Sequence, residues 1–290
     1  MDIRLTENAV AFGGIDCFDL EKSCSCGQAF RWRPYAGGQL GIVRGEAALL
    51  MQDENGVTVH GASPASAGMW AHYLDLGRDY SAIERTVSKD PRLAVCFPEA
   101  HGIRVFNQEP FEALISFIIS QNNNIKRISG IVERLCALCG EPVEFMGERL
   151  NAFPSPERLA AVSEDALTAI GTGYRAPFIK AAAERVASGY DLEKLRDMSL
   201  SEARQELLSF YGIGPKVADC VLLFSLQHSD AFPIDVWIDR AMKAMFFEGS
   251  KAKKAELYEA VSSLGEYSGI IQQYIFQYAR KLGKDGLEKR

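Results

Sequence analysis

Three side chains between positions 216 and 235 could carry out covalent chemistry. The stretch YGIGPKVADC (211–220) puts the primary amine of Lys216 and the thiol of Cys220 four residues apart, which would place both on one face of a helix. A carboxylate follows at Asp235, in AFPIDVWIDRAM. A primary amine can attack an electrophilic carbon and form a Schiff base, and a carboxylate can stabilise positive charge that develops during such a reaction. The chain therefore contains a candidate nucleophile and a candidate charge-stabilising partner.

The residues around Lys216 predict the element that holds it. The segment ARQELLSFYGIGPKVADCVLLFSL predicts a helix, a tight turn and a second helix, and we expect a helix–hairpin–helix over about 204–228. Gly212 and Gly214 permit positive φ and close approach of another molecule, and Pro215 suits a first helical turn. The free N–H groups at the start of the second helix favour an anion, which for this motif is usually a DNA phosphate. The alternative is an ordinary helical corner with a glycine turn.

The residues before Asp235 predict a helix start. Pro233 interrupts the preceding segment, so Asp235 is placed to cap the helix that follows. Each candidate also has an ordinary interpretation. A lysine in a first helical turn is commonly solvated, an N-cap aspartate can be only a cap, and Asp219 could form a surface ion pair with Lys216.

The composition is that of a soluble globular protein. The chain has 290 residues, with 47% hydrophobic and 24% charged residues. No apolar run approaches the ~20 residues of a membrane helix, and the N-terminal MDIRLTENAV does not resemble a secretory signal. The net charge of −6 counts mildly against nucleic-acid binding. However, the phosphates of a nucleic acid contact a local patch of the surface, whose charge can differ from the net charge of the chain.

The cysteines do not predict a metal site. Seven are present, an odd number that argues against a disulfide framework. The pair in CALC (136–139) has ligand spacing but no second pair, and CSC (24–26) has the wrong spacing. We expect reduced, mostly buried thiols and no cofactor.

The N-terminal part is rich in predicted strands. Four short runs with alternating apolar residues are separated by the turn signals YAGG and DENG. These runs are QAFRWRP (28–34), QLGIVRG (39–45), AALLMQ (47–52) and GVTVHG (56–61). They predict an antiparallel meander.

From about Ser81 the apolar spacing becomes helical. Helices are expected within 111–121, 125–140, 177–189, 199–210, 250–265 and 269–282. Ser199 and Glu202 match a capping box, and we expect helices to end at Gly140, Gly189 and Gly249. The predicted fold is α+β, with an N-terminal antiparallel sheet domain over 1–100 and a larger helical body over 101–290.

A hairpin, a lysine in its second helix and then P-x-D-V resemble the helix–hairpin–helix glycosylase superfamily. Within it, four separated motifs occur in the order found in 8-oxoguanine DNA glycosylase of the type shared by eukaryotes and some bacteria. They are SCGQAFRWRP (25–34), SFIISQNNNIKRISGIVERLC (116–136), GTGYRAPFI (171–179) and GIGPKVADCVLL (212–223). The resemblance extends over about 17 to 280. The iron–sulfur cysteines of the endonuclease III and adenine-glycosylase branches are missing.

The resemblance implies a bifunctional DNA glycosylase and AP lyase for base excision repair. Its substrate would be double-stranded DNA containing 8-oxoguanine, preferably opposite cytosine. The protein would act as a monomer without cofactor or membrane, in the nucleoid-containing cytoplasm of a bacterium or in the nucleus of a eukaryote. Lys216 would attack C1′ of the deoxyribose, and Asp235, at the end of a Gly/Pro-rich loop over about 229–236, would stabilise charge on the sugar.

The resemblance also assigns residues that recognise the base. The backbone carbonyl of Gly27 would accept from N7–H of 8-oxoguanine, where guanine has a lone pair instead. Gln272 would bind the Watson–Crick edge and Phe276 would stack on the ring, although Gln273 could exchange roles with Gln272. Cys220 would form a thiolate–ammonium pair with Lys216, a pair that titrates as a unit; its alternative role is a small core residue.

Four more residues match the group that handles the vacated helix. The resemblance implies that Asn122 fills the gap, that Tyr174 wedges into the stack and that Arg127 and Arg175 donate to the orphaned cytosine. The run QNNN followed by KR could otherwise be a polar turn and a solvated face.

One position departs from the family pattern. Trp237 stands where eukaryotic members commonly carry a histidine that touches phosphate, which puts that contact in doubt. Two alternative functions share parts of this pattern. An alkylated-purine glycosylase acts through aspartate alone and would not need Lys216, and a non-catalytic DNA-binding module would need neither Lys216 nor Asp235.

Overall fold

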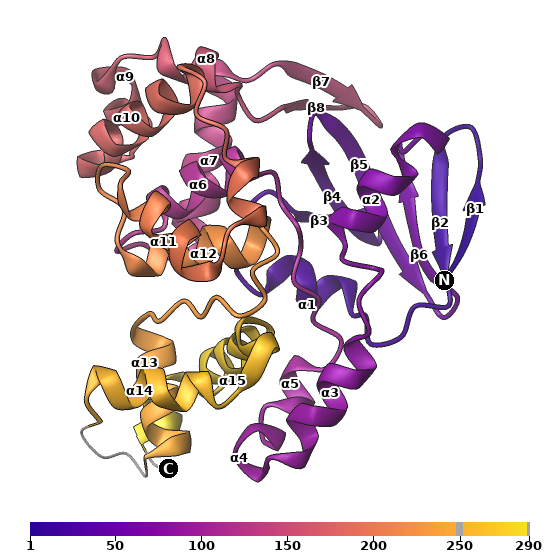
Figure 1. Ribbon diagram of the computed structural model, residues 1–290. Helices are drawn as coiled ribbons and strands as arrows, with labels where there is room; N and C mark the ends of the chain where they lie inside the picture. Colours follow the sequence, from indigo (N-terminus) through magenta and orange to yellow (C-terminus); the bar gives the residue numbers. More distant parts are fainter. Residues whose placement is uncertain (248–251, 289–290) are drawn as a thin grey trace.

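The computed structural model describes residues 1–247 and 252–288, and within them it contains a six-stranded antiparallel sheet and a larger helical body (Figure 1). The strand order in the sheet is β1-β2-β6-β5-β4-β3. The strands are β1 (Asp2–Leu5), β2 (Ala9–Gly13), β3 (Arg33–Tyr35), β4 (Gly38–Val43), β5 (Glu46–Asp53) and β6 (Gly56–His60). The α+β fold expected from the sequence is confirmed.

The register of the sheet gathers its apolar side chains on one face. Val59 lies opposite Val10 on one side and Leu50 on the other, and all three are buried. This face packs against α2 (Ala67–Tyr73), whose Trp70 is fully buried. The alternation of apolar and polar residues seen in the sequence thus produces a half-buried sheet.

Two parts of the N-terminal region differ from the sequence expectation. Strand β3 is only three residues long, and the segment before it is irregular because the buried amide of Gln28 bridges the carbonyls of Ser23 and Arg104. The expected strand over 28–34 was therefore too long. Strands β1 and β2 and the short helix α1 (Leu20–Ser25), which Asp19 caps, were not predicted.

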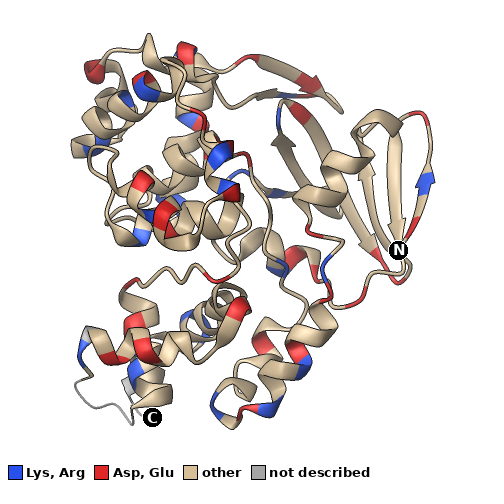
Figure 2. Cartoon of the chain, viewed as in Figure 1, with Lys and Arg blue, Asp and Glu red and all other residues tan. Residues whose placement is uncertain are grey.

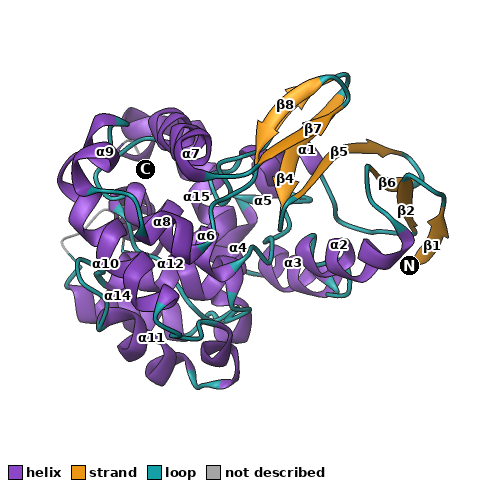
Figure 3. Cartoon of the chain, turned by 90° about the horizontal axis from the view of Figure 1, so that it is seen from above, coloured by secondary structure: helices purple, strands orange, loops and turns teal. Residues whose placement is uncertain are grey.

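The helices form a second, larger core that also includes the helices over 80–100. Every helix expected from the apolar spacing is present within the described residues. The helices are α3 (Tyr80–Lys89), α4 (Pro91–Ala94), α5 (Phe97–Ala100), α6 (Pro110–Ile119), α7 (Ile125–Cys139), α8 (Pro156–Ala160), α9 (Glu164–Ala169), α10 (Ala176–Ala187), α11 (Leu200–Leu208), α12 (Pro215–Ser225), α13 (Val236–Phe246), α14 (Lys254–Ser262) and α15 (Ser268–Glu288). Seen from above, the strands gather at one end and most helices at the other (Figure 3).

Helix ends follow the signals in the sequence. The capping box is confirmed, since the Ser199 N–H donates to Glu202 Oε2 over 3.0 Å and the Glu202 N–H donates to Ser199 Oγ over 3.3 Å. Gly140 is the C-cap of α7, and Gly189, with φ of 98°, directly follows the C-cap of α10. Gly249 lies outside the described residues.

A hairpin of β7 (Pro142–Phe145) and β8 (Glu148–Asn151) extends from the helical body towards the sheet (Figure 1). Arg33 on β3 forms an ion pair with Glu148 over 2.6 Å. Within the described ranges no helix combines the length and apolarity needed to cross a membrane. Positive and negative residues are interspersed over both parts of the chain (Figure 2).

Candidate active site

The turn between α11 and α12 has the predicted helix–hairpin–helix form. Gly212 has φ of 79°, and a Cβ there would lie 2.3 Å from the ring of Phe178, so packing requires glycine. Gly214 differs, because it caps α12 with φ of −102° and a Cβ there would meet nothing within 4 Å. The hairpin therefore leaves open space in front of the first turn of α12, where free N–H groups point.

Lys216 lies in that first turn and makes a specific contact that the sequence did not reveal. Its Nζ donates to Ser120 Oγ over 3.0 Å, and Ser120 in turn donates to the carbonyl of Phe117 over 2.7 Å. The alternative surface ion pair between Lys216 and Asp219 does not form, since Asp219 is buried and accepts a hydrogen bond from Arg204 over 2.7 Å. The amine of Lys216 is thus held by a neutral hydroxyl.

Asp235 is both a helix cap and a cavity residue. Its Oδ1 accepts from the backbone N–H groups of Trp237 and Ile238 over 2.9 and 2.8 Å. Lys216 and Asp235 line the same cavity of about 890 Å³, together with Trp237. The ordinary interpretation of Asp235 as a cap is therefore correct but incomplete.

The base-recognition candidates gather at the inner end of this cavity. Gly27, Lys216, Asp235 and Phe276 line both the large cavity and a narrow recess of about 50 Å³ behind it, into which Cys220 and Gln272 also reach. These residues come from four separate parts of the sequence. The fold brings all six together, as the resemblance implied.

The two adjacent glutamines of α15 have different environments. Gln272 Nε2 donates to the carbonyl of Pro233 over 3.0 Å, while its buried Oε1 has no partner in the described chain. Gln273 Nε2 donates to the carbonyl of Cys26 over 3.1 Å and supports the segment before Gly27. A buried acceptor without a partner is costly, so Gln272 is the one prepared to accept a hydrogen bond from a ligand.

Gly27 occupies a position where a side chain would intrude. Its φ is 89°, and a Cβ would lie 2.7 Å from Ile125 Cδ1 and 3.5 Å from Phe276 Cε1. The absent side chain leaves space between Ile125 and Phe276, which both line the large cavity. Ile125 was not among the candidates from the sequence, because a single isoleucine at a helix start carries no distinguishing signal.

Burial raises the pKa of the Cys220 thiol to about 11, although the neighbouring Lys216 opposes this shift. Burial disfavours the thiolate and the ammonium of Lys216 favours it, so the two effects oppose each other at this sulfur. The thiolate–ammonium pair that the resemblance implied stays a prediction.

The helix-filling candidates lie on or next to segments that line the cavity, since the Tyr174 hydroxyl donates to the carbonyl of the cavity residue Gln121 over 3.4 Å. Asn122 lines it and has φ of 46°, an uncommon value for a residue with a side chain. Tyr174 is 54% exposed, and Arg127 is exposed in the first turn of α7. These three side chains are accessible to a large partner.

Arg175 has a different setting. It is buried, and its guanidinium donates to the backbone carbonyls of Gln121, Asn122 and Thr172. It therefore holds the turn that carries Asn122, and its contact with a cytosine remains a prediction.

The charge around the cavity differs from the total charge of the chain. Lys126, Lys216 and Arg280 line it, against Asp235 and Asp239. The net charge of −6 is thus no guide to the character of this surface.

Comparison with known proteins identifies the class. Residues 14–114 match the family of the 8-oxoguanine DNA glycosylase N-terminal domain, and residues 115–266 match the HhH-GPD superfamily of base excision DNA repair proteins. The chain therefore belongs to the HhH-GPD superfamily and carries the N-terminal domain of the 8-oxoguanine DNA glycosylases.

Individual relatives agree with this assignment. The chain is 33% identical to a probable N-glycosylase/DNA lyase of Methanothermobacter thermautotrophicus, over 68% of this chain and 70% of that protein. It is 34% identical to the N-glycosylase/DNA lyase OGG1 of Arabidopsis thaliana, over 86% of this chain and 74% of that protein. The 8-oxoguanine glycosylase/lyase of Clostridium acetobutylicum, solved with double-stranded DNA containing cytosine opposite 8-oxoguanine, superposes with a TM-score of 0.93 at 32% identity, covering 97% of this chain and 98% of that one.

Proposed function

We propose that the chain is a bifunctional DNA glycosylase and AP lyase that excises 8-oxoguanine from double-stranded DNA, preferentially opposite cytosine. The observation that carries this proposal is the convergence of Lys216, Asp235 and the Gln272 Oε1 acceptor, which has no partner among the described residues, on one recess beside the helix–hairpin–helix. An amine and a carboxylate supply the chemistry, and an unpaired buried acceptor supplies recognition.

Binding begins at the hairpin. The open space at Gly214 and the free N–H groups of α12 suit a backbone phosphate. A duplex base cannot reach Lys216 unless its nucleotide is turned out of the helix, which costs a few kcal/mol. Asn122, which lines the cavity, and the exposed Tyr174, which contacts the neighbouring Gln121, would fill the vacated space.

Recognition of the flipped base follows from hydrogen-bond matching. The Gly27 carbonyl would accept from N7–H of 8-oxoguanine, whereas the N7 lone pair of guanine would face that carbonyl unpaired. Gln272 Oε1 would accept from the Watson–Crick edge, and Phe276 would stack on the ring. An unmatched polar contact in a buried recess costs about 1–3 kcal/mol, which favours the lesion over guanine.

The covalent steps begin at Lys216. Its Nζ, as a neutral amine, attacks C1′, the glycosidic bond breaks, and the base leaves with the bonding electrons and takes up a proton. Asp235 stabilises the positive charge that develops on the sugar. The nitrogen then loses a proton, the C1′–O4′ bond breaks with O4′ taking up a proton, and the ring-opened sugar becomes the Schiff base. Loss of a C2′ proton from this Schiff base breaks the C3′–O bond and expels the 3′ phosphate, and water then hydrolyses the imine and regenerates the amine.

Ser120 assists the first step. Its hydroxyl is already committed as a donor to the Phe117 carbonyl, so it presents a lone pair to Lys216. This contact orients Nζ without adding a negative charge that would stabilise the ammonium form.

A DNA repair function also indicates where the protein acts. We propose that it works with the chromosome, in the nucleoid of a bacterial cell or in the nucleus of a eukaryotic one.

An excision assay tests the proposed function. Duplexes carrying 8-oxoguanine opposite each of the four bases are compared with matched duplexes carrying guanine or 3-methyladenine. We expect release of 8-oxoguanine, fastest opposite cytosine, together with strand cleavage. Release of 3-methyladenine alone, or DNA binding without any excision, would contradict the proposal.

A further inference from the structure

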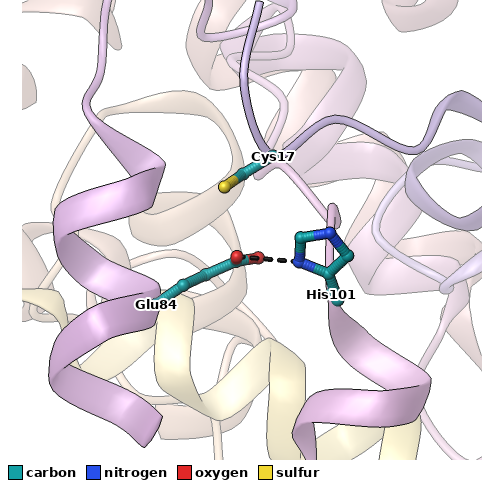
Figure 4. A group of neighbouring side chains, drawn as sticks. All are labelled: Cys17, Glu84 and His101. Carbon is teal, nitrogen blue, oxygen red and sulfur yellow. Dashed lines mark hydrogen bonds and ion pairs between the residues drawn. The ribbon is translucent and has the colours of Figure 1, made fainter.

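A second cluster of reactive side chains lies outside the cavity described above. Cys17, Glu84 and His101 come from the loop after β2, from α3 and from the end of α5. One potential ligand atom of each lies within 4.8 Å of the other two. In Figure 4 the sulfur, the carboxylate and the imidazole face a common space. The residues are far apart in the sequence, so cysteine spacing could not reveal them.

We propose that Cys17, Glu84 and His101 bind an exchangeable Zn²⁺ ion. A thiolate, an imidazole and a carboxylate are the three ligand types that zinc takes in proteins, at about 2.0–2.3 Å. Ligands at those distances around a tetrahedral ion lie about 3–4 Å from one another, so His101 Nδ1 and Glu84 Oε2, now 2.8 Å apart, need to separate only slightly.

The charges of the cluster balance those of the ion. Cys17 as a thiolate and Glu84 as a carboxylate together neutralise Zn²⁺, while His101 binds as a neutral imidazole. Binding releases the thiol proton to solvent, and His101 ligates through Nδ1 as the tautomer that is protonated at Nε2, so Nδ1 also gives up the proton that it donates to Glu84 Oε2. The sulfur ligand excludes Mg²⁺ and Ca²⁺, which prefer oxygen. The positive charge of Arg104, which acts on Cys17, repels a bound cation and so limits the affinity of the cluster for Zn²⁺.

Hydrogen bonds to Oε1, the carboxylate oxygen of Glu84 that does not contact His101, fix the orientation of the Glu84 side chain. Its Oε1 accepts from the backbone N–H of Gly102 over 3.0 Å and from the Tyr274 hydroxyl over 3.3 Å. These contacts leave Oε2 directed at His101. Outer contacts of this kind orient ligands at metal sites.

The backbone of Cys17 is held in an uncommon conformation. Its φ is 50°, in the left-handed region that residues with a Cβ rarely adopt. Strained positions of this kind concentrate at functional sites. The thiol currently contacts Ser81 Oγ at 3.3 Å, an interaction that zinc would replace.

The site is open to solvent on one side. The His101 side chain is 53% exposed, whereas that of Glu84 is 5% exposed. With three protein ligands, the fourth position of a tetrahedral ion would hold water. Because the ligands join three segments, and Glu84 also contacts Tyr274 on α15, bound zinc should stabilise the fold rather than take part in base excision.

The test measures Zn²⁺ binding to the full chain after treatment with chelator. Zinc titration against a chromophoric chelator should give one ion per chain, and Co²⁺ should produce a thiolate-to-cobalt charge-transfer band. Zinc should raise the melting temperature, while Mg²⁺ should not. Excision of 8-oxoguanine is expected to continue without metal, so loss of zinc binding and loss of the proposed function are separate outcomes.

Two ligand variants and two matched controls locate the ion. Cys17→Ser and His101→Ala should each weaken zinc binding more than about tenfold. Loss of a residue that only hydrogen-bonds to a metal ligand already lowers metal affinity by about that factor. His101 is exposed, so its variant should fold. Cys139→Ala, in the CALC pair, and His60→Ala should leave the affinity unchanged. Absence of a one-to-one complex, or equal affinity in the ligand variants, would overturn the site and leave only a hydrogen-bonded cluster.

Discussion

Substitution of Gly27 by alanine tests the geometry of the inner recess. The added Cβ would lie 2.7 Å from Ile125 Cδ1, well inside ordinary contact, and 3.5 Å from Phe276 Cε1. The substitution also places a Cβ at φ of 89°, which costs about 1–2 kcal/mol. Displacing the Ile125 side chain from its rotamer adds about 0.5–1.5 kcal/mol. We therefore expect a loss of about 1.5–3.5 kcal/mol in the free energy of unfolding, measured by urea denaturation.

The effect on excision should exceed the effect expected from backbone strain. A group that intrudes beside the reacting base displaces it, and misplacement by about 1 Å can cost roughly a hundredfold in rate. Gly27→Ala should thus slow single-turnover excision of 8-oxoguanine about 10- to 100-fold.

Two matched variants separate the causes. Gly37 has φ of 81° and open space within 4 Å, so Gly37→Ala should lose stability without losing excision rate. Ile125→Val removes the atom that the new Cβ would meet, so the double variant should regain part of the rate. The reasoning is refuted if Gly27→Ala excises at the normal rate, or if Gly37→Ala slows excision equally.

Three further predictions concern DNA binding, opposite-base choice and pH. In the unaltered protein we expect excision opposite cytosine to exceed excision opposite adenine about 5- to 150-fold, at about 1–3 kcal/mol per unmatched donor. Arg127→Ala should narrow this preference. Equal excision opposite both bases by the unaltered protein would contradict the assignment of Arg127. Gly214→Ala replaces an N-cap glycine, so it should lower the free energy of unfolding by on the order of 0.5–1 kcal/mol and also weaken duplex binding. Gly212→Ala, which would press on Phe178, should lower the melting temperature. Unchanged duplex affinity in a folded Gly214→Ala protein would argue against phosphate binding there. Burial raises the pKa of Glu112 from 4.5 to about 7, so the folded state binds more protons than the unfolded state in that pH interval. The free energy of unfolding should therefore fall, by on the order of 2–3 kcal/mol, as pH rises through the interval. Urea denaturation at pH 5 and 8 should show a smaller fall in Glu112→Gln, and an equal fall in both proteins would refute Glu112 as its cause.

Most of the helical body could be predicted because its apolar spacing is regular and its ends carry standard caps. The capping box at Ser199 is an example of a signal that acts within a few residues. The irregular segment at Gln28 could not be predicted, because its conformation depends on hydrogen bonds to Ser23 and to the distant Arg104. Local patterns in a sequence do not encode such long-range contacts.

The candidate site shows the same division. Lys216 and Asp235 could be identified from residue type and spacing around a turn. Ser120 could not, because a serine near the end of an apolar helix has no distinguishing pattern until the fold places it 3.0 Å from the lysine amine. The choice between Gln272 and Gln273 also required the structure, since only the first leaves a buried oxygen without a partner in the described residues.

The role of Arg175 illustrates a further limit. Its position in the motif GTGYRAPFI indicates a contact with cytosine, but its guanidinium is buried and donates to three backbone carbonyls. The contact with cytosine stays a prediction, because these backbone contacts depend on the fold and residue identity alone does not encode them.

Borohydride trapping tests the central claim most directly. The unaltered protein, mixed with an 8-oxoguanine duplex and sodium borohydride, should form a covalent protein–DNA complex by reduction of the Schiff base. Lys216→Ala should form none and excise no base, yet bind the lesion duplex with nearly unchanged affinity, while Lys194→Ala, which changes an exposed lysine, should behave as the unaltered protein. Trapping by a folded Lys216→Ala protein, or excision by the unaltered protein with no trapped complex, would contradict the account.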